Sequence, residues 1–172
     1  MIAALLMCML CSQWWAQTQV DKLPASASLT LNRRFPGWKF AEVSQEVRQF
    51  FESEMKGRLP YLVSGDFDGN GQTDHAALIR HGEVRNTEGP GRWPRFFLVV
   101  FLRKGKGHRM HVIKNPDGEY LSLAKKGTQD FNYDEQKEIT YANDAIITGI
   151  FEKAGSSYVY ENGRFRSFLS SD

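Results

Sequence analysis

The chain has 172 residues and carries 22 lysine and arginine residues against 20 aspartate and glutamate residues, so its formal net charge at pH 7 is +2. A charge this close to balance excludes a strong general attraction to nucleic acid or to an anionic membrane. The length is that of one domain with a sizeable core.

The first sixteen residues have the character of a secretory leader. Residues 2–10 form an uncharged apolar run, which is shorter than the roughly 20 residues of a membrane span and typical of a signal peptide. We therefore expect residues 1–16 to be a signal peptide, with no transmembrane segment in the mature chain and a periplasmic or extracellular location. A lipid anchor on Cys8 or Cys11 is the alternative, although neither cysteine follows a small residue. Cleavage after Ala16 would leave no cysteine for a disulfide.

After the leader, the sequence predicts a linker and then one helix. Residues 17–34 are polar and include Pro24 and several serines, so we expect an extended linker before a single β-rich domain over residues 35–172. Apolar residues recur at helical spacing over residues 41–55, with charged residues between them. This pattern predicts one amphipathic helix, which Gly57 and Pro60 would end.

Beyond the helix, the pattern is that of short strands and turns. Residues 95–102 are apolar on both faces, which predicts a central strand covered on both sides, with residues 108–113 as its hairpin partner. The pair Asn162 and Gly163 is the strongest hairpin signal, and residues 144–151 predict a further strand. The polar residues 80–94 are expected to form a long surface loop. The expected fold is α+β and β-rich, with an antiparallel sheet of about six to eight strands and one N-terminal amphipathic helix.

The segment from Asp66 to Asp74 reads Asp-Phe-Asp-Gly-Asn-Gly-Gln-Thr-Asp and is the most informative motif. It places oxygen-bearing side chains at relative positions 1, 3, 5 and 9 around two glycines. Ca²⁺ takes six to eight oxygen ligands, and glycines let a short loop turn sharply around the ion. A metal-free turn held by aspartate and asparagine side chains is the alternative. Three carboxylates within nine residues would repel one another there, so we expect a calcium site.

The flanking residues distinguish between two kinds of calcium loop. An EF-hand needs a bidentate glutamate at position 12 and helices on both sides, whereas Ala77 stands at position 12 and the flanks are expected to be strands. Residues 65–78 instead resemble the FG-GAP or VCBS loop of integrin-like β-propeller repeats, in which one strand enters the loop and another leaves it. A propeller needs several blades, and only one copy of the motif is present, so a propeller is excluded.

The resemblance implies a set of ligands. Side-chain oxygens would come from Asp66, Asp68 and Asn70, a backbone carbonyl from Gln72 and a carboxylate from Asp74. The order of elements from Phe35 to Asp172 is also similar to small exported bacterial proteins of the FG-GAP or VCBS-like type, and that similarity implies no known activity.

Other potential sites are weaker. His108 and His111 are three residues apart and would point to opposite faces of a strand, which argues against zinc. No nucleophile elbow, metalloprotease helix or phosphate-binding loop occurs. Two surface features could bind a partner. One is Trp93, and the other is the basic turn that contains Arg103, Lys104, Lys106 and Arg109, which is otherwise a solvated hairpin tip.

The sequence therefore predicts a non-enzymatic, exported calcium-binding module in which Ca²⁺ stabilises one loop between strands. Its expected role is binding at the cell envelope, to a protein or glycan rather than to nucleic acid. The alternatives are an envelope hydrolase with an acidic, metal-assisted site and a purely structural assembly component. A deep pocket with two carboxylates outside the loop from Asp66 to Asp74 would favour the hydrolase.

Overall fold

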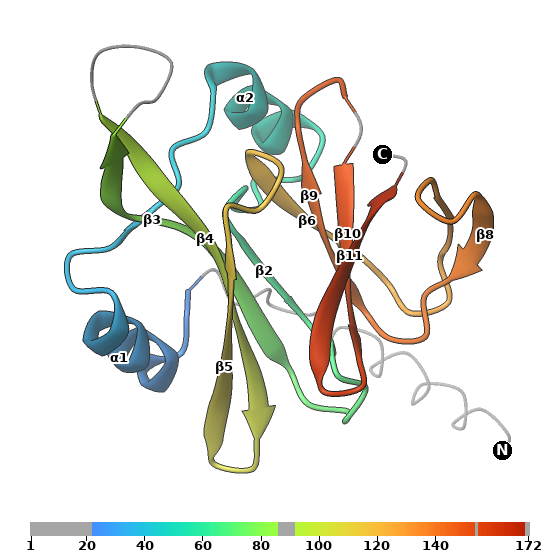
Figure 1. Cartoon of the computed structure of the whole chain (residues 1–172), viewed down its shortest axis with the longest axis horizontal. Coiled ribbons are helices and arrows are strands. Elements are labelled where there is room, and N and C mark those ends of the chain that lie inside the picture. Colours follow the sequence, from blue (N-terminus) through green and yellow to red (C-terminus); the bar gives the residue numbers. More distant parts are fainter. Residues whose placement is uncertain (1–21, 86–91, 154, 171–172) are drawn as a thin grey trace, which may run out of the picture.

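The computed structural model describes residues 22–85, 92–153 and 155–170 (Figure 1). The expected signal peptide, with Cys8 and Cys11, lies outside the described residues. Over this part of the chain there are two helices and eleven strands: α1 (Ala25–Arg34), β1 (Lys39–Phe40), α2 (Gln45–Ser53), β2 (Leu62–Gly65), β3 (Asp74–Arg85), β4 (Arg92–Lys104), β5 (Gly107–Lys114), β6 (Tyr120–Ala124), β7 (Gln129–Asn132), β8 (Lys137–Thr140), β9 (Ala145–Gly149), β10 (Gly155–Glu161) and β11 (Arg164–Ser170).

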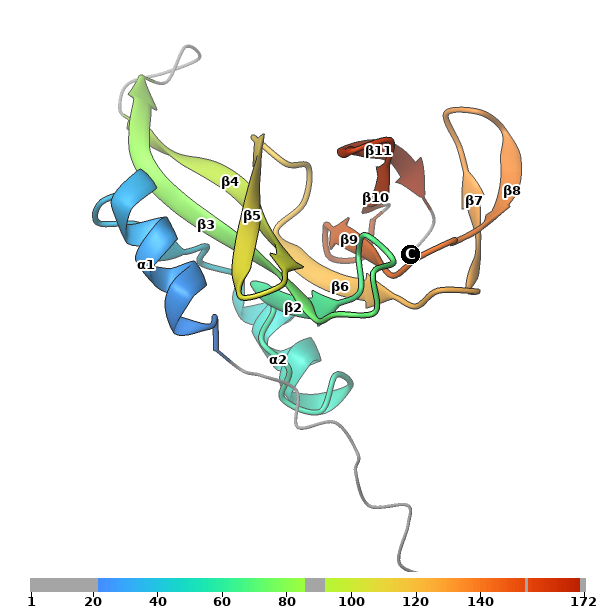
Figure 2. The ribbon, with the colours of Figure 1, turned by 90° about the horizontal axis from the view of Figure 1, so that it is seen from below.

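The strands form two antiparallel sheets. The first sheet has the order β1-β3-β4-β5, with β2 also paired to β3, and the second has the order β6-β9-β10-β11-β7-β8. Figure 2 shows the two sheets next to each other, with β2 and β6 where they meet. The β-rich α+β class is confirmed. The expectation of one sheet with six to eight strands is wrong: the described residues form two sheets with eleven strands, and the short polar segments that form β7 and β8 give no clear alternating pattern.

The main core lies between the two sheets. Leu78, Leu98 and Val100 of the first sheet pack in one cluster with Leu121 and Ile146 of the second. The burial of apolar side chains in such a cluster is the principal favourable contribution to folding. As expected, β4 is the central strand, since it lies between β3 and β5, and Leu98 to Leu102 are fully buried.

A helix covers the outer face of the first sheet, where the sequence predicted an extended linker. In α1, Ala27 and Leu31 lie one turn apart, are fully buried and pack in one cluster with Ile79 and Val99. The linker prediction over residues 17–34 is therefore wrong from Ala25 onward. Only two buried side chains lie on the inner face of this helix, so its apolar stripe was too narrow to recognise.

The helix predicted over residues 41–55 is present but shorter. It corresponds to α2, whose N-cap residue Ser44 accepts a hydrogen bond on Oγ from the backbone N–H of Val47. An N-cap of this kind satisfies one of the free donors at the start of a helix. Val47 and Phe51 pack against Tyr120, the first residue of β6, so α2 covers the second sheet where that strand begins.

Residues 80–94 do not form the long loop that their polarity predicted. β3 and β4 remain paired as far as Arg85 opposite Arg92, after a register shift between Arg80 and Glu83. The segment is polar because this two-stranded ribbon extends beyond the core, and residues 86–91 of the expected loop lie outside the described part.

The hairpin at Asn162 and Gly163 is confirmed, and both residues have the positive φ of a type I′ turn, 50° and 83°.

Candidate metal site

The metal motif forms the connection between β2 and β3. These strands pair antiparallel with Gly65 opposite Asp74, so the two ends of the loop lie side by side. Ala77 is fully buried within β3. Strands rather than helices flank the loop, and position 12 offers no ligand, so the structure agrees with the exclusion of an EF-hand.

A buried phenylalanine fixes the loop against the core. The side chain of Phe67 is fully buried in the cluster between the sheets. Its neighbours Asp66 and Asp68 are only half-buried. Successive side chains point in opposite directions here. Phe67 therefore anchors the loop in the core, while the carboxylates of Asp66 and Asp68 point away from the core.

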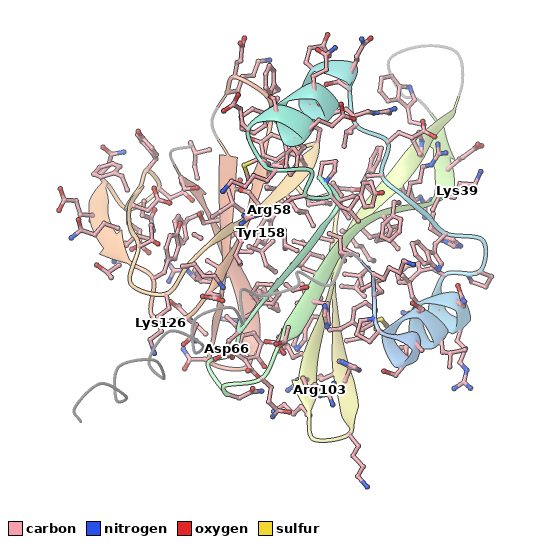
Figure 3. The ribbon with its side chains drawn as sticks, turned by 180° about the vertical axis from the view of Figure 1, so that it is seen from behind. Lys39, Arg58, Asp66, Arg103, Lys126 and Tyr158 are labelled. Carbon is pink, nitrogen blue, oxygen red and sulfur yellow. The ribbon has the colours of Figure 1, made fainter. Side chains whose placement is uncertain are left out.

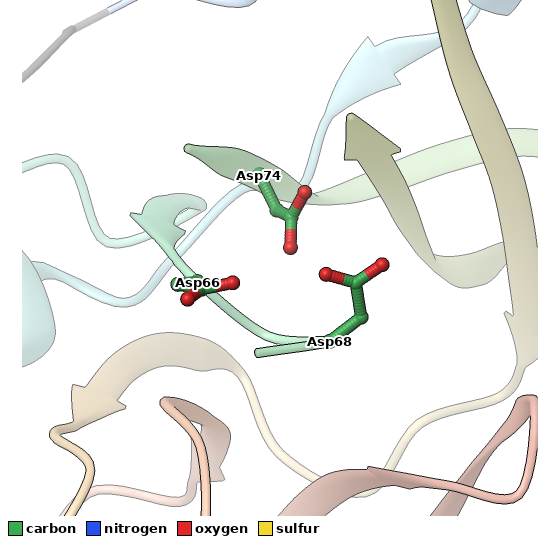
Figure 4. A group of neighbouring side chains, drawn as sticks. All are labelled: Asp66, Asp68 and Asp74. Carbon is green, nitrogen blue, oxygen red and sulfur yellow. The ribbon is translucent and has the colours of Figure 1, made fainter. Parts of the chain in front are cut away.

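Three carboxylates of the loop converge. Asp66, Asp68 and Asp74 each offer an oxygen atom, and these oxygens lie within 4.8 Å of one another. Figure 4 shows the three side chains pointing toward a common space. Among the ion pairs of the described residues, none joins a lysine or arginine to these three side chains. Like charges this close are unfavourable without a compensating cation.

The loop's own hydrogen bonds leave one carboxylate oxygen without a partner. Asp66 Oδ2 accepts from the backbone N–H of Gly71 (2.9 Å), and Asp68 Oδ1 accepts from that of Asn70 (3.2 Å). Asp66 Oδ1 is buried and has no hydrogen-bond donor in the described structure. Burying an unpaired carboxylate oxygen is costly, so its position favours a bound cation over the metal-free turn.

Asp74 is the most deeply buried of the three. Its side chain is 0% exposed, and its two oxygens accept the backbone N–H groups of Phe67 (2.9 Å) and Arg103 (2.6 Å). Burial raises the pKa of this carboxyl to about 6, although the two backbone donors act in the opposite direction. It is therefore still ionised at neutral pH, and each oxygen has a further lone pair for an ion.

The two remaining predicted ligands hold the loop together. Asn70 accepts the backbone N–H of Gln72 on Oδ1 (2.8 Å) and donates from Nδ2 to the carbonyl of Arg103 (2.9 Å). Asn70 therefore connects the loop to β4, and its Oδ1 keeps a second lone pair. The assignment of Asn70 Oδ1 and of the Gln72 carbonyl as metal ligands stays a prediction.

Asp144, which the sequence did not single out, joins the loop to the second sheet. Its Oδ2 accepts a hydrogen bond from the backbone N–H of Asp66 (3.0 Å) and forms an ion pair with Nζ of Lys125 (2.9 Å). Its Oδ1 accepts a hydrogen bond from the backbone N–H of Lys126 (3.0 Å). Its own N–H donates to the carbonyl of Asp66 (3.2 Å). Burial would raise the pKa of Asp144, but these donors outweigh burial and hold it below the usual value. No local pattern could reveal a partner 78 positions away.

The predicted surface features lie far apart. Trp93 is 60% exposed, but it lies ten residues before Arg103 on β4, about 33 Å along an extended strand. Arg103, Lys104, Lys106 and Arg109 are all exposed at the opposite end of that strand. The structure therefore does not bring the tryptophan and the basic turn into one surface.

The histidines do not form a zinc site. His108 contacts Ser26 of α1, with 3.2 Å between Nδ1 and Oγ, whereas His111 packs between Tyr160 and Phe165 of the second sheet. The two rings thus lie on opposite faces of β5, as predicted. Within the described residues, the three aspartates of the loop are the one group of three or more metal-ligating side chains that come together.

A cavity of about 180 Å³ lies between the β7–β8 hairpin and strands β10 and β11. Three carboxylates outside the calcium loop line it, from Glu135, Asp144 and Glu161. Glu135 forms ion pairs with Lys137 and Arg166, and hydrogen bonds from these two side chains lower its pKa. The pKa values of Glu135 and Asp144 are lowered rather than raised, which is the opposite of what a general acid needs.

No protein-family model matches the chain, and no match is found among curated proteins or among solved structures.

Proposed function

We propose that the protein is a calcium-binding module in which Ca²⁺ occupies the loop from Asp66 to Asp74. The observation that carries this proposal is the convergence of three carboxylates that have no basic partner among the described residues, together with the buried Oδ1 of Asp66, which is unpaired in the same part of the chain. Ca²⁺ prefers carboxylate oxygens and tolerates irregular geometry. A cation at this point would satisfy the unpaired oxygen and remove the repulsion among the three side chains.

The role proposed for the ion is to stabilise the junction of the two sheets. On one side, Asp74 and Asn70 bind the backbone of Arg103 in β4; on the other, Asp66 binds Asp144 just before β9. An ion that fixes Asp66 and Asp74 relative to each other also fixes these two connections. This role is structural, and it requires no reaction at the metal.

The proposed compartment is the exterior or the periplasm, and the proposed biological role is binding a protein or glycan of the envelope. Three acidic ligands without a bidentate glutamate predict a dissociation constant of about 10⁻⁵ to 10⁻³ M, as in extracellular calcium modules. A site this weak would fill outside the cell and stay empty at cytosolic calcium. No helix among the described residues is long and apolar enough to cross a membrane.

The ion pairs of the cavity argue against the hydrolase alternative, because each of its three carboxylates pairs with a lysine or arginine. A purely structural assembly role remains compatible with the same calcium site. The two roles are distinguished by whether the calcium-loaded protein binds an added ligand, as the binding role requires and the assembly role does not.

The proposal is tested by calorimetric titration of the protein with CaCl₂. We expect one site per chain in the wild type and at least about tenfold weaker binding for Asp66→Ala, since that change removes both the unpaired oxygen and one charge. Glu52→Ala is the matched control, because Glu52 is an exposed carboxylate on α2 and should bind calcium like the wild type. Equal binding by Asp66→Ala would show that the ligands have been assigned wrongly.

A further inference from the structure

The turns on the two sides of the metal loop are basic. One is the β4–β5 turn and the other follows β6, and their exposed cations are Arg103, Lys104, Lys106, Arg109, Lys125 and Lys126. Figure 3 shows Asp66, Arg103 and Lys126 at one end of the molecule, with α2 at the other end. The exposed carboxylates of α2 and its C-cap are those of Glu46, Glu52 and Glu54.

One basic turn is hydrogen-bonded to the metal loop directly, and the other is linked to it through Asp144. Arg103, where the β4–β5 turn begins, donates its N–H to Asp74 and accepts from Asn70 on its carbonyl. On the other side, Asp144 binds the N–H groups of both Lys126 and Asp66. Whatever fixes the loop therefore also fixes the backbone of the two basic turns relative to each other.

A calcium ion in this loop would have coordination positions left over. All its protein ligands would come from one short segment, with three carboxylates at its centre, whereas Ca²⁺ takes six to eight oxygens. Asn70 and Gly71, at the tip of the loop, are exposed, so the outer side of the ion would face solvent. Water or an oxygen of a bound ligand can complete the shell there.

We propose that this end of the molecule binds a polysaccharide of uronic acids, with one sugar carboxylate on Ca²⁺ and neighbouring carboxylates on the two basic turns. The inference rests on the calcium site proposed above and names the ligand class of that site. Carboxylates are the hard oxygen ligands that calcium prefers, and they form charge-assisted hydrogen bonds with arginine and lysine. A polymer with a carboxylate on each sugar matches cations that are distributed on both sides of one ion.

The surface lacks the features that insertion into a membrane or stacking of a neutral sugar would use. The large hydrophobic side chains that are exposed in the described residues are Leu29, Trp93, Tyr133, Ile150 and Leu169, and none of these lies in the two basic turns. Insertion into a membrane interface needs apolar residues beside the cations, and a neutral sugar would have no exposed aromatic ring to stack on there. Charge is thus the main basis for recognition.

The first test measures binding of the full chain to short oligogalacturonides, which are too short to form a gel with calcium. We expect binding in CaCl₂, loss of binding in EGTA and weaker binding as NaCl is raised. Neutral dextran oligosaccharides should not bind. Binding that survives EGTA would overturn the role of the ion, and tighter binding to phosphatidylglycerol vesicles than to oligogalacturonides would identify a membrane surface as the ligand instead.

The second test removes three cations from the two turns with the combined variant Lys104→Gln, Lys106→Gln, Lys126→Gln. Exposed ion pairs contribute modestly, so we expect roughly tenfold weaker oligogalacturonide binding, with a calcium affinity at least as high as that of the wild type. The control Arg48→Gln, Lys56→Gln, Lys153→Gln removes three exposed cations from or near α2 and should leave binding unchanged.

Calcium titration of each variant keeps the two proposals separate. If the wild type binds calcium but no oligogalacturonide, the present inference is wrong and the calcium site stands. If it binds no calcium, the proposed function fails as well. Equal losses in the two triple variants would show that net charge, rather than the turns beside the loop, controls binding, and would also overturn the inference.

Discussion

At the scale of single residues, two glycines of the metal loop differ in what surrounds them. Gly69 and Gly71 have positive φ values of 73° and 78°. A Cβ on Gly69 would lie 2.4 Å from Oδ1 of Asn143, whereas one on Gly71 would meet nothing within 4 Å. Gly71 is therefore needed for its backbone conformation alone, and Gly69 also because the loop lies close to the second sheet.

This difference predicts unequal effects of alanine. Gly71→Ala should destabilise the fold by about 1 to 2 kcal/mol, the cost of a left-handed residue with a Cβ. Gly69→Ala should cost more, because the methyl group also displaces Asn143, and adding Asn143→Ala should return the stability to about that of Gly71→Ala. Urea unfolding in the presence of EGTA measures these effects, and equal losses in the two single variants would contradict the close approach.

At the scale of elements, the sequence was most informative where a pattern was strong and local. The strand-loop-strand arrangement around Asp66, the buried strand β4 and the hairpin at Asn162 could all be predicted, because each depends on neighbouring residues. The loop's link to Asp144 could not, since it joins positions 78 apart. The strands β9, β10 and β11 of the second sheet were predicted, but β7 and β8 were not, because each has only four residues and is mostly polar, which leaves little hydrophobic alternation.

Helix α1 shows most clearly how tertiary packing overrides a polar sequence. Two of its leucines provide a matched comparison, since Leu31 is fully buried against the first sheet and Leu29 is 58% exposed. Leu31→Ala should destabilise the protein by about 2 to 5 kcal/mol by leaving a cavity, and Leu29→Ala by less than about 0.5 kcal/mol. Denaturant unfolding of both variants measures the difference. Two equally small losses would mean that residues 25–34 behave as the linker that the sequence predicted.

At the scale of the whole molecule, the two sheets also meet at His111. Its ring, on β5, packs edge-on against Tyr160 and Phe165 of the second sheet, and its buried Nε2 has no partner among the described residues. Burial, with Arg109 and Lys104 nearby, lowers the pKa of His111 from its ordinary value of 6.5. The folded protein therefore holds this ring neutral at a pH where the unfolded chain protonates it.

This shift has a defined consequence for stability. Between the ordinary and the lowered pKa of His111, this residue binds more protons in the unfolded state, so its contribution to the free energy of unfolding falls as the pH falls below about 6.5. His111→Phe should keep the aromatic packing and reduce this loss, although His75 and His108, whose pKa values are also lowered, preserve part of it. Urea unfolding between pH 7.5 and pH 5 compares the two proteins, and the same slope in both would show that His111 does not contribute.

The central claim is that calcium in the Asp66 to Asp74 loop stabilises the junction of the two sheets, and thermal unfolding with and without calcium tests it most directly. At free calcium about a hundredfold above the dissociation constant, binding should stabilise the fold by roughly 2.7 kcal/mol, which corresponds to a rise of about 5 to 10 °C in Tm. Magnesium at the same concentration should have a smaller effect, because it demands stricter octahedral geometry. A Tm that is the same in saturating CaCl₂ and in EGTA would contradict the account.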